Sequence, residues 1–248
     1  MPARRGPTPG ARPAVHFLAA NFRVRGAVIE PEFWKTRWAA GQIAFHQAKT
    51  NPHLERHLAW LTGGVRARLL VPLCGKSNDL AYLANLGHPV VGIEMVEQAV
   101  VDFFAEHALV PTRAKEEKLE RFTAEEVELL RADFFDVTRA DVGSVSGAFD
   151  RAALIALPPE LRARYVPHLV ELLAPGARIL LVTLNYDQLV MSGPPFSVPG
   201  AEVRALFAPT CEVELLEQHE CLEEADNARF KTRGLRSMEE QVWSLRVR

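Results

Sequence analysis

Short apolar runs alternate with amphipathic stretches along most of the chain, which is typical of strands and helices in succession. Runs at 68–73 and 89–93 enclose a helical segment, and this pattern predicts two parallel strands joined by a helix. We expect Pro175 and Gly176 to end a later helix just before a strand. Further runs predict at least three more strands, at 127–130, 149–157 and 178–184.

The segment before the first strand has a helical pattern rich in aromatic residues. Phe33, Trp34 and Trp38 fit one helical face, and Gly41 should stop that helix. A second short helix is expected at about 52–60. These two helices would form a cap in front of the sheet.

The C-terminal part should close the sheet with antiparallel strands. A proline-rich loop precedes an amphipathic helix around 201–207, and apolar and polar residues then alternate at 211–218 and 238–245. The sequence therefore predicts an α/β fold with a doubly wound sheet, mostly parallel, with an antiparallel C-terminal strand and helices on both faces.

Composition indicates how the chain is divided into a tail and a domain, and which classes of binding partner to expect. Residues 1–13 hold four prolines and three arginines and are expected to be a disordered tail, leaving 14–248 as a single domain with an N-terminal helical cap. The 29 basic and 31 acidic side chains give a net charge of -2, which predicts neither nucleic-acid nor membrane binding. No apolar run approaches the roughly 18 residues of a membrane span. We expect a monomer.

The cysteines predict a reducing compartment, the cytoplasm. Cys74, Cys211 and Cys221 are odd in number and widely spaced, and no two of them form a C-x-x-C pair. A disulfide framework and a structural metal site are therefore not expected. His46 and Cys74 are taken as packing residues, because a lone histidine or cysteine beside apolar neighbours usually packs.

Two positions at predicted strand ends carry binding chemistry. Ligands of open parallel sheets bind beyond the carboxyl ends of the strands. Gly75 can form a tight turn there, and the helix that starts near Ser77 offers unpaired N–H groups. Glu94 ends the next strand, where a nucleoside-binding fold places the acceptor for ribose hydroxyls. The alternative is that Glu94 caps the following helix, 96–104.

Two phosphate-binding patterns fail at the same turn. Gly75, Lys76 and Ser77 match the end of the motif G-x-x-x-x-G-K-[ST], but Leu70 stands where its first glycine is required. The dinucleotide pattern G-x-G-x-x-G also fails, because no further glycine follows Gly75 to admit a pyrophosphate. A nicotinamide enzyme is thus disfavoured.

Several motifs in order resemble the thiopurine S-methyltransferase family. The resemblance runs from about 31 to 245 and rests on W-x3-W-x6-FHQ at 34–47, PLCGK at 72–76, GHPVVGIE at 87–94, FFDV at 134–137, FDRAALIAL at 149–157 and GPPFSVP at 193–199. It implies a class I methyltransferase (Rossmann-like) fold that binds S-adenosylmethionine, without a metal. The cofactor-binding residues that it implies are Trp34, Trp38, Phe45, Leu73, Gly75, Glu94, Asp133, Phe134 and Arg151.

Chemistry is compatible with these implied roles, and each has a structural alternative. Trp34 and Trp38 could cover the cationic sulfonium or simply pack in the core. Arg151 could pair with the cofactor carboxylate or form an ion pair with Asp150. Phe45 would be one wall of the acceptor pocket.

The resemblance also implies an acceptor site. Pro194, Pro195 and Phe196 would form the second wall, although without the family they would be a surface loop, and Arg229 would lie near the acceptor. Arg151 and Arg229 are the catalytic candidates, since a nearby guanidinium favours a thiolate.

The implied reaction is methyl transfer to the sulfur of an aromatic or heterocyclic thiol, with S-adenosylhomocysteine as second product. The acceptor would be a small-molecule thiol or selenol. Selenium or tellurium compounds, thiocyanate and halide stay open as acceptors. From another class, a nucleoside-binding interaction module also stays open.

Overall fold

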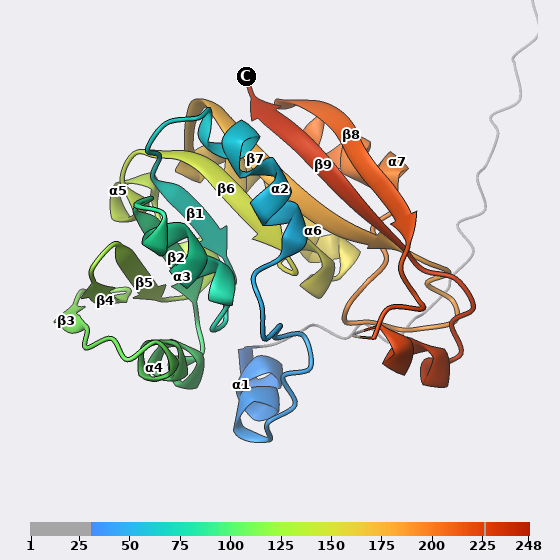
Figure 1. The fold of residues 1–248 in the computed structure, drawn as a ribbon, viewed down its shortest axis with the longest axis horizontal. Helices are drawn as coiled ribbons and strands as arrows, with labels where there is room; N and C mark the ends of the chain where they lie inside the picture. The colour runs from blue at the N-terminus through green and yellow to red at the C-terminus, as the bar shows by residue number, and fades with distance from the viewer. Residues whose placement is uncertain (1–30, 226) are drawn as a thin grey trace, which may run out of the picture.

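The computed structural model describes residues 31–225 and 227–248. The expected disordered tail at 1–13 and the start of the expected domain at 14–248 lie outside the described residues. Within them, one nine-stranded sheet has the order β3-β4-β5-β2-β1-β6-β7-β9-β8 (Figure 1). Its strands are β1 (Leu69–Pro72), β2 (Val90–Glu94), β3 (Thr112–Lys115), β4 (Glu120–Ala124), β5 (Val127–Arg131), β6 (Val145–Arg151), β7 (Leu173–Asn185), β8 (Cys211–Glu220) and β9 (Glu239–Val247).

The centre of the sheet is parallel and its two edges are antiparallel. Strands β5, β2, β1, β6 and β7 pair in parallel, with β1 in the middle, where the connections change direction. Strand β9 runs antiparallel to β7 and to β8, as the alternation near the C-terminus predicted. A second antiparallel hairpin, β3–β4, extends the opposite edge. The predicted fold class is confirmed.

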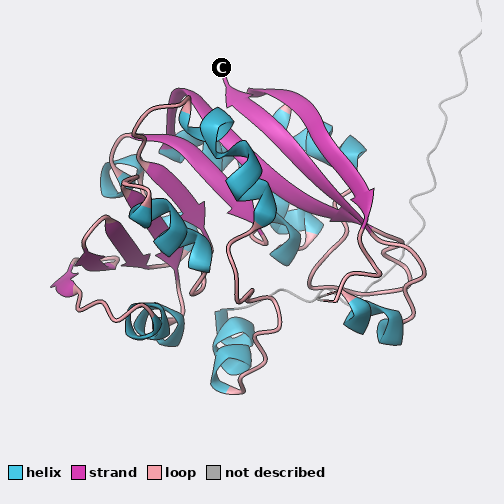
Figure 2. Cartoon of the chain, viewed as in Figure 1, coloured by secondary structure: helices cyan, strands magenta, loops and turns pink. Residues whose placement is uncertain are grey.

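Helices cover both faces of the sheet, as Figure 2 shows. One face packs mainly against α2, α3 and α4, and the other against α5, α6 and α7. Neighbouring residues of a strand divide between these faces: Leu69 and Val71 belong to one buried cluster and Leu70 to the other. The α-helices are α1 (Pro31–Ala39), α2 (Pro52–Thr62), α3 (Asn78–Asn85), α4 (Glu97–Glu106), α5 (Arg139–Val142), α6 (Pro159–Leu172) and α7 (Gly200–Phe207).

Three short 3-10 helices lie in the loops: η1 (Phe134–Asp136), η2 (Leu154–Ala156) and η3 (Ala228–Arg233). Helix α1 lies beyond the carboxyl ends of the central strands, and η3 lies at the same end of the molecule (Figure 1). Helix α1 ends just before Gly41, which has a φ of 66°. Of the two helices expected to form the cap, α1 is therefore placed over the strand ends where ligands of such sheets bind, whereas α2 packs against one face of the sheet.

Two predictions about elements were wrong, and one pair of strands was not predicted. The apolar run 149–157 is not one strand, because β6 ends at Arg151 and Ala152 has a φ of 72°, after which η2 buries Leu154. Pro175 and Gly176 do not end a helix: α6 ends at Leu172 and the chain enters β7 directly. The hairpin β3–β4 was missed, because β3 is exposed and has no apolar pattern.

Candidate active site

A cavity of about 950 Å³ opens at the carboxyl ends of the parallel strands. Its walls come from the α1 segment, the ends of β1, β2, β5 and β6, the loop after β7, and η3. Segments that are far apart in the sequence are thus brought together around one space. Twelve of the thirteen predicted site residues line it: Trp34, Trp38, Phe45, Leu73, Gly75, Glu94, Asp133, Phe134, Arg151, Pro194, Pro195 and Arg229.

The turn after β1 brings backbone close to an aromatic ring. Leu73 and Gly75 both have positive φ, 45° and 53°. A Cβ on Gly75 would lie 3.3 Å from Trp38 Cζ2, so a side chain at this position would press on the indole. Ser77 then caps α3, its hydroxyl accepting a hydrogen bond from the N–H of Asp79 (3.2 Å). Glycine therefore fits both the conformation and the space here.

Glu94 is a buried carboxylate, 6% exposed, on the cavity wall. Its two oxygens accept hydrogen bonds from the backbone N–H of Gly75 (2.9 Å) and of Val96 (2.8 Å). Burial raises its pKa, an effect that these hydrogen bonds oppose. The two interpretations of Glu94, as an acceptor for ribose hydroxyls and as a cap of α4, are compatible. The carboxylate accepts a hydrogen bond from Val96 at the start of α4 and still has lone pairs on the cavity side.

The aromatic residues of the cap meet edge to face. The ring of Phe45 lies 5.7 Å from that of Trp34 and 6.0 Å from that of Trp38. Trp38 is only 7% exposed and packs with Val96 and Ala99, so packing accounts for most of its surface. Trp34 is half-buried and also lines the cavity.

Arg151 joins the cap to the sheet. Its Nη1 donates a hydrogen bond to the backbone oxygen of Phe45 (3.1 Å). Asp150 belongs to the opposite face of β6, where its carboxylate accepts hydrogen bonds from the Tyr165 hydroxyl (2.7 Å) and the Leu154 N–H (3.1 Å). These contacts favour a position of Arg151 on the cavity over an ion pair with Asp150.

Of the remaining predicted residues, Asp133 and Phe134 line the cavity, whereas Phe196 does not. Asp133 caps η1 by accepting from the N–H of Phe135 (2.9 Å), and Phe134 packs its ring 4.9 Å from that of Tyr165. Phe196 is not among the described residues that line the cavity; a Cβ on Gly193 would lie 2.5 Å from its ring. Phe196 therefore packs against the turn of its own loop, and the guanidinium of Arg162 lies 5.8 Å from its ring.

Sequence comparison places the chain in a known family. The thiopurine S-methyltransferase (TPMT) family matches residues 29–248. The chain belongs to the thiopurine S-methyltransferase family. It is 48% identical to a thiopurine S-methyltransferase of Pseudomonas fluorescens over 218 residues, which cover 88% of this chain and 99% of that protein. It is also 48% identical to one of Azotobacter vinelandii, covering 89% and 100%.

Solved structures agree with this family at the level of the fold. A Burkholderia thailandensis 1,6-didemethyltoxoflavin-N1-methyltransferase with bound S-adenosylhomocysteine has a TM-score of 0.57 at 16% identity, covering 87% of this chain and 86% of that one. The N-methyltransferase NodS of Bradyrhizobium japonicum, also with S-adenosylhomocysteine, has a TM-score of 0.56 at 11% identity, covering 86% and 98%. The protein is an S-adenosylmethionine-dependent methyltransferase.

Several cavity residues of this methyltransferase were missed by the sequence reasoning. They are the cationic side chains Arg37, Lys76, Arg164 and Arg233. Lys76 lies within the PLCGK motif, but no local pattern marks Arg37, Arg164 and Arg233, because single basic residues occur on most solvated helices and loops. Only the folded chain brings these side chains to one cavity. Lys76 is paired with Glu106 at 2.5 Å.

The residues expected only to pack behave in two ways. Cys74 is buried, and burial raises the pKa of its thiol well above the ordinary value, so it is not a thiolate at neutral pH. His46 lines the cavity, and burial lowers its pKa. No helix in the described ranges is both long and apolar enough to cross a membrane.

Proposed function

We propose that this methyltransferase methylates the sulfur of aromatic or heterocyclic thiols, giving a methyl thioether and S-adenosylhomocysteine. The observation that carries the proposal is one cavity lined both by a buried hydrogen-bond acceptor, Glu94, and by the apolar side chains of Phe45, Pro194 and Pro195. Cationic side chains, among them Arg229, line the same cavity. The relatives named thiopurine S-methyltransferase support the same acceptor class.

The cofactor would lie at the end of the cavity near β1 and β2. Glu94 would accept hydrogen bonds from the ribose hydroxyls, the backbone beside Asp133 and Phe134 would contact the adenine, and Arg151 would pair with the amino-acid carboxylate. Trp34 would cover the sulfonium, a cation–π contact of ~0.5–2 kcal/mol. When bound, S-adenosylmethionine supplies an electrophilic methyl group.

The acceptor would lie between Phe45 and the wall formed by Pro194 and Pro195. Rigid apolar groups can hold a flat heterocycle without ordering a flexible loop. Phe196 would support this wall without touching the acceptor, because it packs against the turn at Gly193 and does not line the cavity.

Catalysis would consist of alignment and of charge stabilisation. Displacement at a methyl group needs the attacking sulfur in line with the leaving sulfur and shielded from water, and it needs no strong base. A thiol with an ordinary pKa of about 8.5 becomes a better nucleophile when a guanidinium stabilises its anion. Arg229 lines the cavity with its guanidinium 4.7 Å from the ring of Phe230, which orients it.

The acceptor class can be tested by methyl transfer from labelled S-adenosylmethionine to mercaptopurine, selenite and a halide in parallel. We expect methylation of mercaptopurine to dominate. Turnover of selenite or halide alone would instead make those the acceptors. Cofactor binding without transfer to any of the three would reject the proposed function.

An Arg229→Ala variant tests the acceptor side. We expect turnover of mercaptopurine to fall by about 10-fold or more, on the order of one charge-assisted contact, with cofactor affinity unchanged. Arg236→Ala is the matched control, because Arg236 is an exposed arginine of the same loop that does not line the cavity. Equal turnover in both variants would remove Arg229 from the mechanism.

The cellular setting remains a prediction: a monomer in the cytoplasm, acting on a small molecule. Cys74, Cys211 and Cys221 are all buried and none forms a disulfide, which suits a reducing compartment. Size-exclusion chromatography with light scattering would test the monomer directly.

A further inference from the structure

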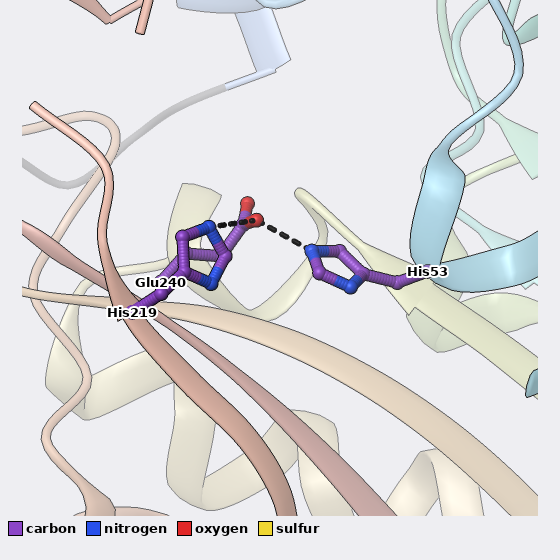
Figure 3. Close-up of side chains that lie close together, drawn as sticks. All are labelled: His53, His219 and Glu240. Atoms are coloured by element: carbon purple, nitrogen blue, oxygen red, sulfur yellow. Dashed lines mark hydrogen bonds and ion pairs between the residues drawn. The ribbon is translucent and has the colours of Figure 1, made fainter. Parts of the chain in front are cut away.

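Three potential metal ligands meet where α2 packs against the β8–β9 hairpin. His53 comes from the first turn of α2, His219 from β8 and Glu240 from β9 (Figure 3). One ligand atom from each lies within 4.8 Å of the other two. His53 Nε2 is 2.7 Å and His219 Nε2 is 3.7 Å from the same oxygen, Glu240 Oε1. The two imidazoles thus approach one carboxylate, His53 from α2 and His219 from β8.

These spacings are close to those of a first coordination sphere. Zinc binds imidazole nitrogen and carboxylate oxygen at about 2.0–2.2 Å in tetrahedral geometry, so its ligand atoms are about 3.3–3.6 Å apart. The two distances to Glu240 Oε1 lie on either side of that interval. Rotations that move side-chain atoms by less than about 1 Å would therefore accommodate an ion.

The environment of His53 gives an independent indication. Its side chain is 5% exposed, and its Nδ1 is buried without a hydrogen bond, although Glu217 Oε2 is 3.3 Å away. A neutral imidazole has one N–H, so it cannot donate to carboxylates at both nitrogens. A cation beside Nε2 resolves this conflict, because Nδ1 can then carry the proton and donate to Glu217.

Two further side chains fix the position of Glu217, the carboxylate that would accept from His53 Nδ1. Arg56 and His57, one turn along α2, both bind its carboxylate. A carboxylate that accepts from the second ring nitrogen of a metal-bound histidine is the usual outer-shell arrangement of zinc sites. The cluster therefore contains both the ligands and the group that would orient one of them.

We propose that His53, His219 and Glu240 bind a divalent transition-metal ion, for which zinc is the best match. Two imidazoles and one carboxylate suit zinc rather than calcium or magnesium, which prefer oxygen ligands. The fourth position would be taken by water or by Glu224, an exposed side chain 3.3 Å from His219 Nε2. Sequence spacing gave no hint of this site, because its ligands are up to 187 positions apart.

The ion would join α2 to the ends of β8 and β9, between which the segment with Arg229 lies. Glu240 lines the active-site cavity, as do Arg229 and Phe230 of the segment between β8 and β9. The role assigned to the metal is thus to anchor the segment between β8 and β9, and it does not depend on which acceptor is methylated.

The test is metal binding by the full chain after treatment with a chelator. Zinc is titrated against a chromophoric competitor, and cobalt(II) serves as a spectroscopic probe. We expect one zinc per chain and a cobalt spectrum of nitrogen and oxygen ligands. His219→Gln should weaken zinc binding at least 10-fold, and Glu217→Gln by about 10- to 100-fold.

The matched control is His107→Gln, because His107 is a half-buried histidine outside the cluster. It should bind zinc like the parent chain. Melting curves without metal establish that each variant is folded, and His219 is the safest ligand to change because its side chain is 38% exposed. Three results would overturn the proposal: no saturable zinc binding, equal affinity in His219→Gln and His107→Gln, or a thiolate-to-cobalt charge-transfer band.

Discussion

Replacing Glu94 by glutamine separates the two jobs that its carboxylate performs. In the wild type, its two oxygens accept from the N–H groups of Gly75 and Val96. Glutamine keeps one carbonyl oxygen, so its NH₂ group must face the other N–H. One buried donor then loses its partner, which costs about 1–3 kcal/mol of the free energy of unfolding. Relief from burying a charged carboxylate, the cause of its raised pKa, offsets part of this loss.

The effect on the cofactor should be larger than a general loss of stability explains. Hydrogen bonds from ribose hydroxyls to a charged acceptor contribute about 1.5–3 kcal/mol. Their weakening predicts a Kd for S-adenosylhomocysteine raised by about 10- to 100-fold, since 1.4 kcal/mol corresponds to a factor of ten. Isothermal titration calorimetry with S-adenosylhomocysteine measures this Kd.

The matched control for Glu94→Gln is Glu97→Gln. Glu97 lies in the first turn of α4, its side chain is 56% exposed, and its partner Arg131 is 3.5 Å away. This variant loses the same formal charge close by and should bind the cofactor like the wild type. A Kd for Glu94→Gln within twofold of the wild type, in a protein that melts normally, would refute the ribose-binding role. Equal weakening of cofactor binding in both variants would mean that the loss of a negative charge, and not a lost hydrogen bond to the ribose, causes the effect.

Two further predictions concern the fold around the site. In Gly92→Ala, the new Cβ would lie 2.6 Å from Leu129 Cδ2 and 2.7 Å from Cys74 Sγ; we expect a loss of about 1–3 kcal/mol in urea unfolding, and an unchanged midpoint would contradict this packing. Burial raises the pKa of Asp150 to about 6, so the folded chain retains a proton that the unfolded chain has released. Stability should therefore fall by about 2 kcal/mol from pH 4 to 6 through this group, and Asp150→Asn should lack that slope.

Local chemistry explains why the sequence predicted the cofactor end of the site well. The turn at Gly75 and the acidic end of β2 are each encoded within a few residues, and the order of parallel strands then brings them together. The limits of strands were predicted less well where an apolar run continues into a buried turn after the strand has ended. Leu154, for example, is buried by a 3-10 turn after β6 has ended, and hydrophobicity alone does not distinguish these two ways of burying a side chain.

The sequence by itself determined the alternation of strands and helices, the closing antiparallel strands, and the family to which the chain belongs. The tertiary structure decided which distant side chains share a space. It turned Arg151 toward the backbone of Phe45, kept Phe196 off the cavity wall, and gathered His53, His219 and Glu240 at one junction. The physical reason is that periodicity fixes which face of an element is buried, whereas contacts between elements depend on how complete faces pack together.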